Sequence, residues 1–303
     1  MRVLVTGGAG FIGSHLVDAL VEAGHAVAVV DDLSTGKAAH VNSGAALSQV
    51  DICGPELAAA FDAATPETVF HVAAQSSVSA SVRDPWRDAE VNVLGTLNVL
   101  RECAAHGVGR IVFISTGGAL YGEPERLPAD EGHPVRPLSP YGVSKAAGEA
   151  YVAAMSRLSG MRYSVLRGAN VYGPRQDPHG EAGVVAIFIG AMLAGRQPTI
   201  NGDGLHERDY VYVDDVVRAN LLAMEMTGDG AFNIGSGVGV TVREVFDACA
   251  AATGYEGEPR YGPERPGDVR RIRLDATLAE RELDWRPAVP FAEGVARVAR
   301  SMR

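Results

Sequence analysis

Three glycines, each three residues after the last, follow the first apolar run of the chain. Arg2 to Val5 is predicted as a strand, and Thr6-Gly-Gly-Ala-Gly-Phe-Ile-Gly13 separates it from a helix predicted over Phe11 to Ala23. Glycines at this spacing permit a tight turn, close approach of the backbone to a pyrophosphate, and close helix–strand packing. The helix N-terminus adds unpaired N–H groups and a partial positive charge. The turn therefore predicts a dinucleotide site, with the pyrophosphate against Gly7, Gly10, Phe11, Ile12 and Gly13.

Acidic and small residues after the next strands extend this site. The strand Ala26 to Val30 ends at Asp31 and Asp32, where a carboxylate can bind a ribose diol and repel a 2′-phosphate, which favours NAD over NADP. Asp51 and Ile52 follow another short strand and either flank the adenine or belong to an ordinary loop. Finally, Ala73, Ala74 and Gln75 place small side chains where a cofactor would cross the sheet edge, although such side chains also suit simple packing.

Strands and helices alternate through the first half of the chain. Further strands are predicted over Thr68–Val72, Arg110–Ser115 and Tyr163–Arg167, with helices over Trp86–His106 and Ser139–Leu158. This alternation is typical of an α/β fold, a Rossmann-like, doubly wound parallel sheet covered on both faces. After Tyr172-Gly-Pro174, Gly, Pro and charged residues interrupt the pattern, which indicates a smaller cap and a closing helix over Phe291–Met302.

Composition excludes several classes of function. The 303 residues carry 27 Lys+Arg and 37 Asp+Glu, a net charge of −10, without a basic cluster that would bind nucleic acid or an anionic membrane. No run approaches the ~18 apolar residues of a membrane span, and the N-terminus lacks the pattern of a secretory signal. The three cysteines, Cys53, Cys103 and Cys249, are few and widely spaced, so we expect no disulfide framework and a reducing cytoplasm.

Tyr141 and Lys145 form the first candidate for chemistry. They lie in the first turns of a helix that Ser139 caps and Pro140 begins, and a spacing of four puts both side chains on one face. A phenol has a pKa near 10, and lowering it to about 7 requires roughly 4 kcal/mol. A nearby ammonium and a positive nicotinamide ring favour the phenolate, which can then take a proton from a hydroxyl. Alone, such a pair is frequent by chance, but downstream of a dinucleotide turn it predicts a catalytic base.

A hydroxyl at the end of the preceding strand would complete such a site. Ser115 and Thr116 both compete for contact with the reacting oxygen, and either could instead serve the turn that follows the strand. The histidines, among them His71 and His206, show no spacing typical of metal ligands, so we predict no metal.

The motifs of the chain resemble those of the extended short-chain dehydrogenase/reductases. Within that superfamily they resemble the NAD-dependent nucleotide-sugar epimerases, most of all bacterial UDP-glucose 4-epimerases. The resemblance covers nearly the whole chain. Its motifs are TGGAGFIGSH at 6–15, STGGALYG at 115–122, SPYGVSK at 139–145, NVYGPRQ at 170–176, RDYVYVDD at 208–215, RPGD at 265–268 and WRP at 285–287.

The resemblance implies a role for each matching residue. Tyr141 would be the catalytic base, Lys145 its electrostatic partner and a ligand of the cofactor ribose, and Thr116 the catalytic hydroxyl, with Ser115 beside the cofactor. Asn170, Arg208 and Arg265 would bind the substrate diphosphate, and Asp268 the uridine ribose. NAD-binding residues would fill 1–172 with 209–235 returning to that domain, and a UDP-sugar domain would be built from 173–208 and 236–303.

The chain departs from the family pattern in two places. The loop from Thr116 to Tyr121 is one residue longer, so counting back from Tyr121 gives Gly117, which has no hydroxyl. Gly168 stands where the family usually has an aromatic residue. Family members that eliminate water or carboxylate usually place an acid near Thr116, whereas Gly117 and Gly118 stand here, which favours redox-neutral epimerisation.

The predicted function is therefore epimerisation at C4 of a UDP-hexose with NAD kept in the site. UDP-N-acetylhexosamine and UDP-glucuronate remain alternative substrates, because Ile272, which the resemblance places beside the sugar, is of intermediate size. A net NAD-dependent dehydrogenase or reductase is a further alternative, and a non-catalytic NAD sensor is disfavoured by the intact Tyr141–Lys145–Thr116 set. The family also implies a homodimer formed through helices near 86–106 and 139–158.

Overall fold

The computed structural model describes residues 1–179, 183–264 and 269–303. Within these ranges the chain forms two compact units. Unit 1 comprises Met1–Thr116, Ser139–Arg167 and Val217–Phe232, and unit 2 comprises Gly117–Leu138, Gly168–Val216 and Asn233–Arg303. None of the described helices combines the length and the hydropathy that crossing a bilayer requires.

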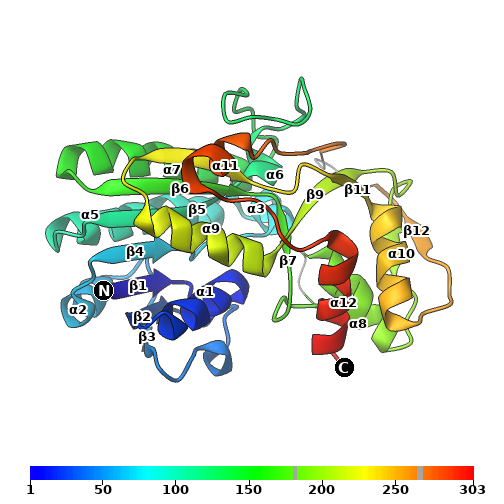
Figure 1. Ribbon diagram of the computed structural model, residues 1–303, viewed down its shortest axis with the longest axis horizontal. Helices are drawn as coiled ribbons and strands as arrows, with labels where there is room; N and C mark the ends of the chain where they lie inside the picture. Colours follow the sequence, from blue (N-terminus) through cyan, green and yellow to red (C-terminus); the bar gives the residue numbers. More distant parts are fainter. Residues whose placement is uncertain (180–182, 265–268) are drawn as a thin grey trace. The chain divides into compact units, whose positions relative to one another are not determined.

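Unit 1 is organised by a seven-stranded sheet with the strand order β10-β6-β5-β4-β1-β2-β3 (Figure 1). The neighbours from β3 to β5 pair in parallel. Strand order 3-2-1-4-5-6 is that of dinucleotide-binding doubly wound folds, so the predicted α/β, Rossmann-like class is confirmed. The strands are β1 (Arg2–Thr6), β2 (Ala26–Asp31), β3 (Ala46–Gln49), β4 (Thr68–His71), β5 (Arg110–Thr116), β6 (Arg162–Gly168) and β10 (Gly230–Ile234).

Helices cover both faces of the sheet, because the strands point apolar side chains to both faces. Leu4 on β1 belongs to a buried cluster with Phe61 of α2, Leu100 of α5 and Val152 of α7. On the other face, Gly8 lies close to Val29 of β2 and Val17 of α1, and Figure 1 shows α9 running in front of the sheet. The helices are α1 (Phe11–Glu22), η1 (Ala38–His40), α2 (Leu57–Ala64), α3 (Val78–Arg83), α4 (Pro85–Ala89), η2 (Glu90–Gly95), α5 (Thr96–Ala105), α7 (Pro140–Ser159) and α9 (Val213–Glu225).

The helix predicted over Trp86–His106 is not regular. It consists of α4, the π-helical turn η2 and α5. The Thr96 hydroxyl, at the start of α5, donates to the Asn92 carbonyl in η2 at 2.7 Å, while the Asn92 side chain bonds to both the N–H and the C=O of Gln75. Side-chain bonds to the backbone at these points compete with the regular helical ladder. Periodicity alone did not reveal the wider turn.

Unit 2 has smaller sheets and three packed helices. One sheet has the order β11-β9-β7, with β9 antiparallel to β11 and parallel to β7, and β8 pairs with β12 in parallel. The ring of Phe188 on α8 packs edge-on to Phe246 on α10. The elements are α6 (Gly117–Leu120), β7 (Asn170–Tyr172), α8 (Val184–Leu193), β8 (Thr199–Asn201), β9 (Glu207–Tyr212), β11 (Gly239–Thr241), α10 (Val242–Thr253), β12 (Arg260–Gly262), α11 (Thr277–Leu283) and α12 (Phe291–Ser301).

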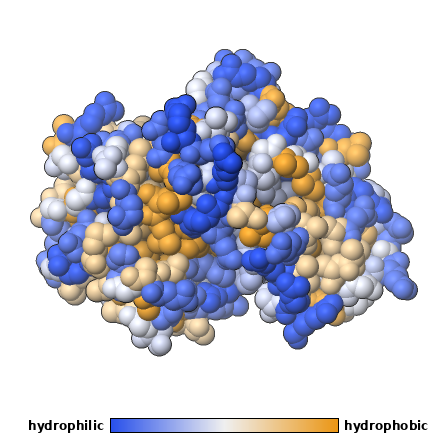
Figure 2. Space-filling view, in the orientation of Figure 1, coloured by the Kyte–Doolittle hydropathy of each residue, from blue (hydrophilic) through white to orange (hydrophobic). Residues whose placement is uncertain are grey.

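The predicted closing helix is α12, which is strongly amphipathic. Its buried side carries Val295 and Val298, whereas Glu293 and Arg297 form an ion pair four residues apart. Figure 2 shows hydrophilic residues gathered over the outward face of this helix. An apolar stripe at helical spacing, with charges opposite, is what a surface helix requires.

Candidate active site

The glycine turn between β1 and α1 leaves no room for side chains. Gly7 has a φ of +72°, and a Cβ added to it would lie 2.6 Å from the Ala73 nitrogen. A Cβ on Gly13 would lie only 2.1 Å from the Gly7 carbonyl oxygen. Gly10 is the N-cap of α1, where no side chain caps the helix, and Phe11 and Ile12 begin a first turn without acidic residues. Such a cradle of backbone at a helix N-terminus fits a pyrophosphate.

Asp31 is the acid that faces this turn. Its carboxylate accepts the Ala9 N–H and the Leu33 N–H, both at 2.9 Å, and its side chain is almost fully buried at the end of β2. Each carboxylate oxygen has a second lone pair, so a ribose diol can still be accepted there. Asp32 instead accepts the N–H and the hydroxyl of Ser34 within its own exposed turn.

The other proposed cofactor contacts have mixed surroundings. Asp51 accepts the Cys53 N–H at 2.8 Å. The Ile52 side chain belongs to the hydrophobic core of unit 1, which leaves only its backbone for a ligand. Ala73 donates its N–H to the Thr6 carbonyl at the end of β1, and the Gln75 amide donates to Asp88 at 2.8 Å.

Tyr141 and Lys145 lie in the first two turns of α7, as predicted. Ser139 caps the helix by accepting the Gly142 N–H, Pro140 occupies the first position, and Gly160 ends it in the left-handed conformation. Tyr141 forms a side-chain hydrogen bond with Thr116 at the end of β5. Lys145 is 3% exposed, and its ammonium lies 4.1 Å from the centroid of the Phe113 ring.

The two competing hydroxyls have different partners. Thr116 bonds to Tyr141, whereas the Ser115 hydroxyl donates to the Glu149 carboxylate at 2.5 Å. This geometry puts Thr116, rather than Ser115, in a position to share a proton with the phenol. Gly117 and Gly118, where elimination enzymes would carry an acid, begin the short helix α6.

Burial changes the acidity of both groups in opposite directions. It raises the pKa of Tyr141 to about 12, against the lowering effect of its hydrogen bond with Thr116. It lowers the pKa of Lys145 to about 8, against the attraction of Glu149 and Asp88. The pKa of the phenol therefore lies about two units above the ordinary value of a tyrosine. Lowering it to 7 requires roughly 7 kcal/mol rather than 4.

Two of the four proposed substrate residues can be placed. Asn170 on β7 lies opposite Tyr210 on β9, and Arg208 is two residues earlier on β9. Side chains on directly opposed residues, and on residues two apart, leave a sheet on the same face, so Asn170 and Arg208 share a face of unit 2. Tyr141, Lys145 and Thr116 belong to unit 1. Arg265 and Asp268 lie outside the described residues.

Several buried polar residues near Tyr141 were not singled out from the sequence. Asp88 and Asn92 are each 1% exposed, and the Asn92 amide donates to Asp88 and to the Ser144 hydroxyl. Glu149 and Arg167 form a nearly buried ion pair at 2.7 Å. Glu149 follows Lys145 by four residues, a spacing that was visible in the sequence, whereas nothing local to Asp88 or Asn92 signalled burial.

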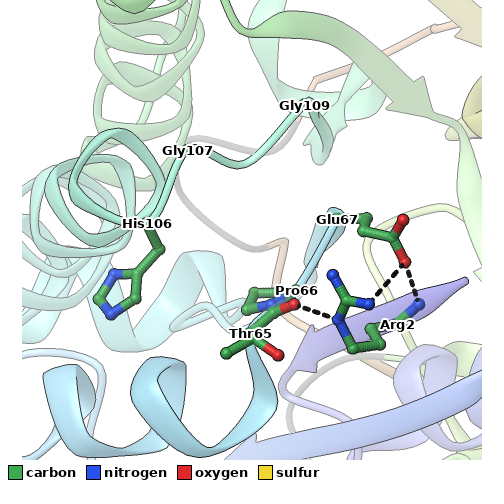
Figure 3. Close-up of a pocket in the computed structure, with 7 residues that line it drawn as sticks. All are labelled: Arg2, Thr65, Pro66, Glu67, His106, Gly107 and Gly109. Atoms are coloured by element: carbon green, nitrogen blue, oxygen red, sulfur yellow. Dashed lines mark hydrogen bonds and ion pairs between the residues drawn. The ribbon is translucent and has the colours of Figure 1, made fainter.

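A separate depression of about 390 Å³ lies at the opposite edge of the sheet (Figure 3). Its lining residues precede or begin strands β1, β4 and β5, whereas the glycine turn follows β1. Ligands of open parallel sheets bind beyond the carboxyl ends of the strands. In this depression Arg2 already donates to the Thr65 carbonyl at 2.7 Å and its N–H donates to Glu67 at 2.8 Å. We therefore assign the site to the glycine-turn edge.

Comparison with known proteins identifies the family. The model of the family described as "NAD dependent epimerase/dehydratase family" matches residues 3–235. A UDP-glucose 4-epimerase from Mycolicibacterium smegmatis is 48% identical over 100% of this chain and 99% of its own.

Two solved structures are similar over the whole chain. The UDP-glucose 4-epimerase of Thermotoga maritima, solved with UDP-glucose, has a TM-score of 0.98 at 51% identity and covers 100% of this chain and 99% of its own. The UDP-glucose 4-epimerase of Thermus thermophilus, solved with NAD, has a TM-score of 0.95 at 48% identity with the same coverage.

Proposed function

The chain belongs to the NAD dependent epimerase/dehydratase family, and on that premise we propose that it interconverts UDP-glucose and UDP-galactose by inverting C4 of the hexose. The observation that carries the proposal is the Tyr141–Thr116 hydrogen bond, with Lys145 one turn further along the same face of α7. The similar enzymes of known structure, one with UDP-glucose and one with NAD, support the substrate and the cofactor.

NAD fits the glycine turn and the acid behind it. The backbone of Gly7, Gly10, Phe11, Ile12 and Gly13 would hold the pyrophosphate, because this turn ends at the N-terminus of α1, where backbone N–H groups have no helical partners. Asp31 and Asp32 would serve the adenosine ribose, and Asp51 with the backbone of Ile52 the adenine. Ala73, Ala74, Gln75, Ser115, Tyr141 and Lys145 would line the rest. When bound, NAD supplies a reversible hydride acceptor and donor.

The chain's own residues manage the proton. Tyr141 takes the proton of the sugar 4-hydroxyl while Thr116 holds the same oxygen, and it returns the proton when the 4-keto sugar is reduced on its other face. The phenolate of this buried tyrosine requires a neighbouring cation, which Lys145 provides. Because burial raises the pKa of the phenol to about 12, that cation must be charged at the working pH.

Fixing the UDP end of the substrate would leave the sugar free to rotate in the site. Asn170 and Arg208 would hold the diphosphate from one face of the β11-β9-β7 sheet, with Arg265 as a second forked donor and Asp268 on the uridine ribose. The roles of Arg265 and Asp268 rest on the resemblance in sequence. Ile272 is buried in unit 2.

The test is turnover without added cofactor. Purified enzyme is incubated with UDP-galactose, UDP-N-acetylgalactosamine or UDP-galacturonate, and products are separated by chromatography. We expect conversion of UDP-galactose to UDP-glucose without a net absorbance change at the nicotinamide wavelength. Net accumulation of reduced nicotinamide would instead identify a dehydrogenase, and preference for another sugar would change the substrate.

We also propose a homodimer and a cytoplasmic location. Apolar side chains are exposed along the helices of one region of unit 1: Val82 (61%), Trp86 (84%), Leu94 (60%) and Val143 (55%). Exposed apolar patches of this kind mark association surfaces. The cytoplasm suits the three free thiols, Cys53, Cys103 and Cys249.

The dimer has its own prediction. Leu94→Glu combined with Val143→Glu places like charges on the patch, and we expect a halved mass by sedimentation or light scattering. The matched control is Leu205→Glu, at an apolar side chain of unit 2 that is 56% exposed, which should leave the mass unchanged. A wild-type protein that sediments as a monomer at every concentration would refute the dimer.

A further inference from the structure

Glu149 lies on the same face of α7 as the two catalytic candidates but has no part in the mechanism above. Tyr141, Lys145 and Glu149 follow one another at intervals of four residues, which places them on one helix face. The Glu149 carboxylate is bound from two strands of the sheet. Ser115 on β5 donates to it at 2.5 Å, and the forked guanidinium of Arg167 on β6 donates at 2.7–3.2 Å.

This arrangement fixes the Glu149 carboxylate where little water can reach it. The side chains of Glu149 and Arg167 are only 12% and 10% exposed. Bidentate binding by a guanidinium limits the rotamers of a carboxylate. The Glu149 carboxylate is thereby fixed one helical turn from Lys145.

The charged groups facing Lys145 come from several elements. Glu149 on α7 attracts the ammonium most strongly and Asp88 on α4 comes second, both opposing the burial that lowers the Lys145 pKa to about 8. Asp88 is already shared, because its carboxylate accepts the amides of Gln75 and Asn92. On β4, burial lowers the pKa of His71 to about 3, so this ring is neutral near pH 7.

We propose that Glu149, held by Ser115 and Arg167, is a positioning residue that keeps the Lys145 ammonium charged at the pH at which Tyr141 works. The inference rests on the proposed function for its consequence in catalysis, but not for the effect of Glu149 on the charge of Lys145. A neutral Lys145 would leave the Tyr141 phenolate without its counter-charge, and the base would be lost.

The lysine content of the chain permits a direct test. The sequence contains only two lysines, Lys37 and Lys145, so protein labelled with ¹³C at lysine Cε gives two signals to follow by NMR as pH is raised. Lys37 is exposed and serves as an internal reference. We expect Glu149→Gln to lower the Lys145 pKa by about one unit or more, while Lys37 stays unchanged. The alkaline limb of the kcat–pH profile should move to lower pH by a similar amount.

The matched control removes another buried acid of unit 1. Glu102 on α5 is 5% exposed and pairs at 2.9 Å with Arg101, whose side chain is 65% exposed, so Glu102→Gln tests loss of a buried carboxylate elsewhere. It should change neither the Lys145 titration nor the pH profile. If Glu149 served only to stabilise the fold, Glu149→Gln would lower the melting temperature but leave the Lys145 titration and the kcat–pH profile unchanged. That result would overturn the proposal.

A second variant covers poor folding. Glu149→Gln combined with Arg167→Gln does not leave the Arg167 charge buried without its partner, and two amides can still hydrogen-bond to each other. We expect the Lys145 pKa to fall in this variant too, and an unchanged value contradicts the inference. The titration needs neither NAD nor turnover. A shifted Lys145 in a protein without epimerase activity would therefore count against the proposed function alone.

Discussion

Tyr141→Phe should reduce epimerase turnover by a factor of about 10³ or more, since positioned proton transfer contributes roughly 10²–10⁴. The substitution removes one oxygen, the atom that bonds to Thr116 and would take the sugar proton. Burial raises the pKa of the phenol to about 12, so the wild-type side chain is neutral near pH 7. Its replacement by phenylalanine therefore leaves no buried charge without a partner. We expect the loss of one neutral hydrogen bond to cost only about 1 kcal/mol of folding free energy.

Turnover and retained NAD are measured on the same preparation. The control is Tyr163→Phe, a half-buried tyrosine on β6 of the same unit, which should keep wild-type activity. NAD content should be unchanged in both variants. A Tyr141→Phe enzyme that keeps a tenth or more of wild-type turnover would remove Tyr141 from the role of base.

Gly13→Ala should abolish retention of NAD and destabilise unit 1. The added Cβ would lie 2.1 Å from the Gly7 carbonyl oxygen and 2.9 Å from the Gly8 Cα, both backbone atoms that cannot rotate away. The turn must therefore move, and with it the N-terminus of α1 that would face the pyrophosphate. We expect NAD content to fall from nearly one per chain to a trace, together with a lower melting temperature.

Mass analysis of the purified protein and a thermal melt provide the two readouts. The control is Gly109→Ala, because a Cβ there meets only the Glu67 carbonyl oxygen at an ordinary 3.5 Å. That variant should keep its NAD. Full NAD content in Gly13→Ala would show that the cofactor does not depend on the geometry of this turn.

Features set by residues close in sequence were predictable. The glycine turn, the cap of α7 at Ser139, and the spacing of Tyr141 and Lys145 all depend on a few neighbouring residues. The parallel pairing in the sheet followed from the alternation of strands and helices, because parallel strands need crossover connections.

Features set by distant contacts were not predictable. Arg167 meets Glu149 because β6 lies beside β5 under α7, which no local pattern states. The π-helical turn at Asn92 arises from bonds to Gln75, seventeen residues earlier. Burial also altered the chemistry, since the Tyr141 pKa rises to about 12 only within the folded unit.

The wild-type reaction with UDP-galactose that carries deuterium at C4 tests the account most directly. Incubated in ordinary water with no added NAD, the enzyme should yield UDP-glucose that keeps its deuterium at C4, because the hydrogen leaves the carbon and returns without meeting solvent. UDP-glucose that has exchanged this deuterium for solvent hydrogen, or no conversion at all, would contradict transient oxidation at C4 with Tyr141 as the base.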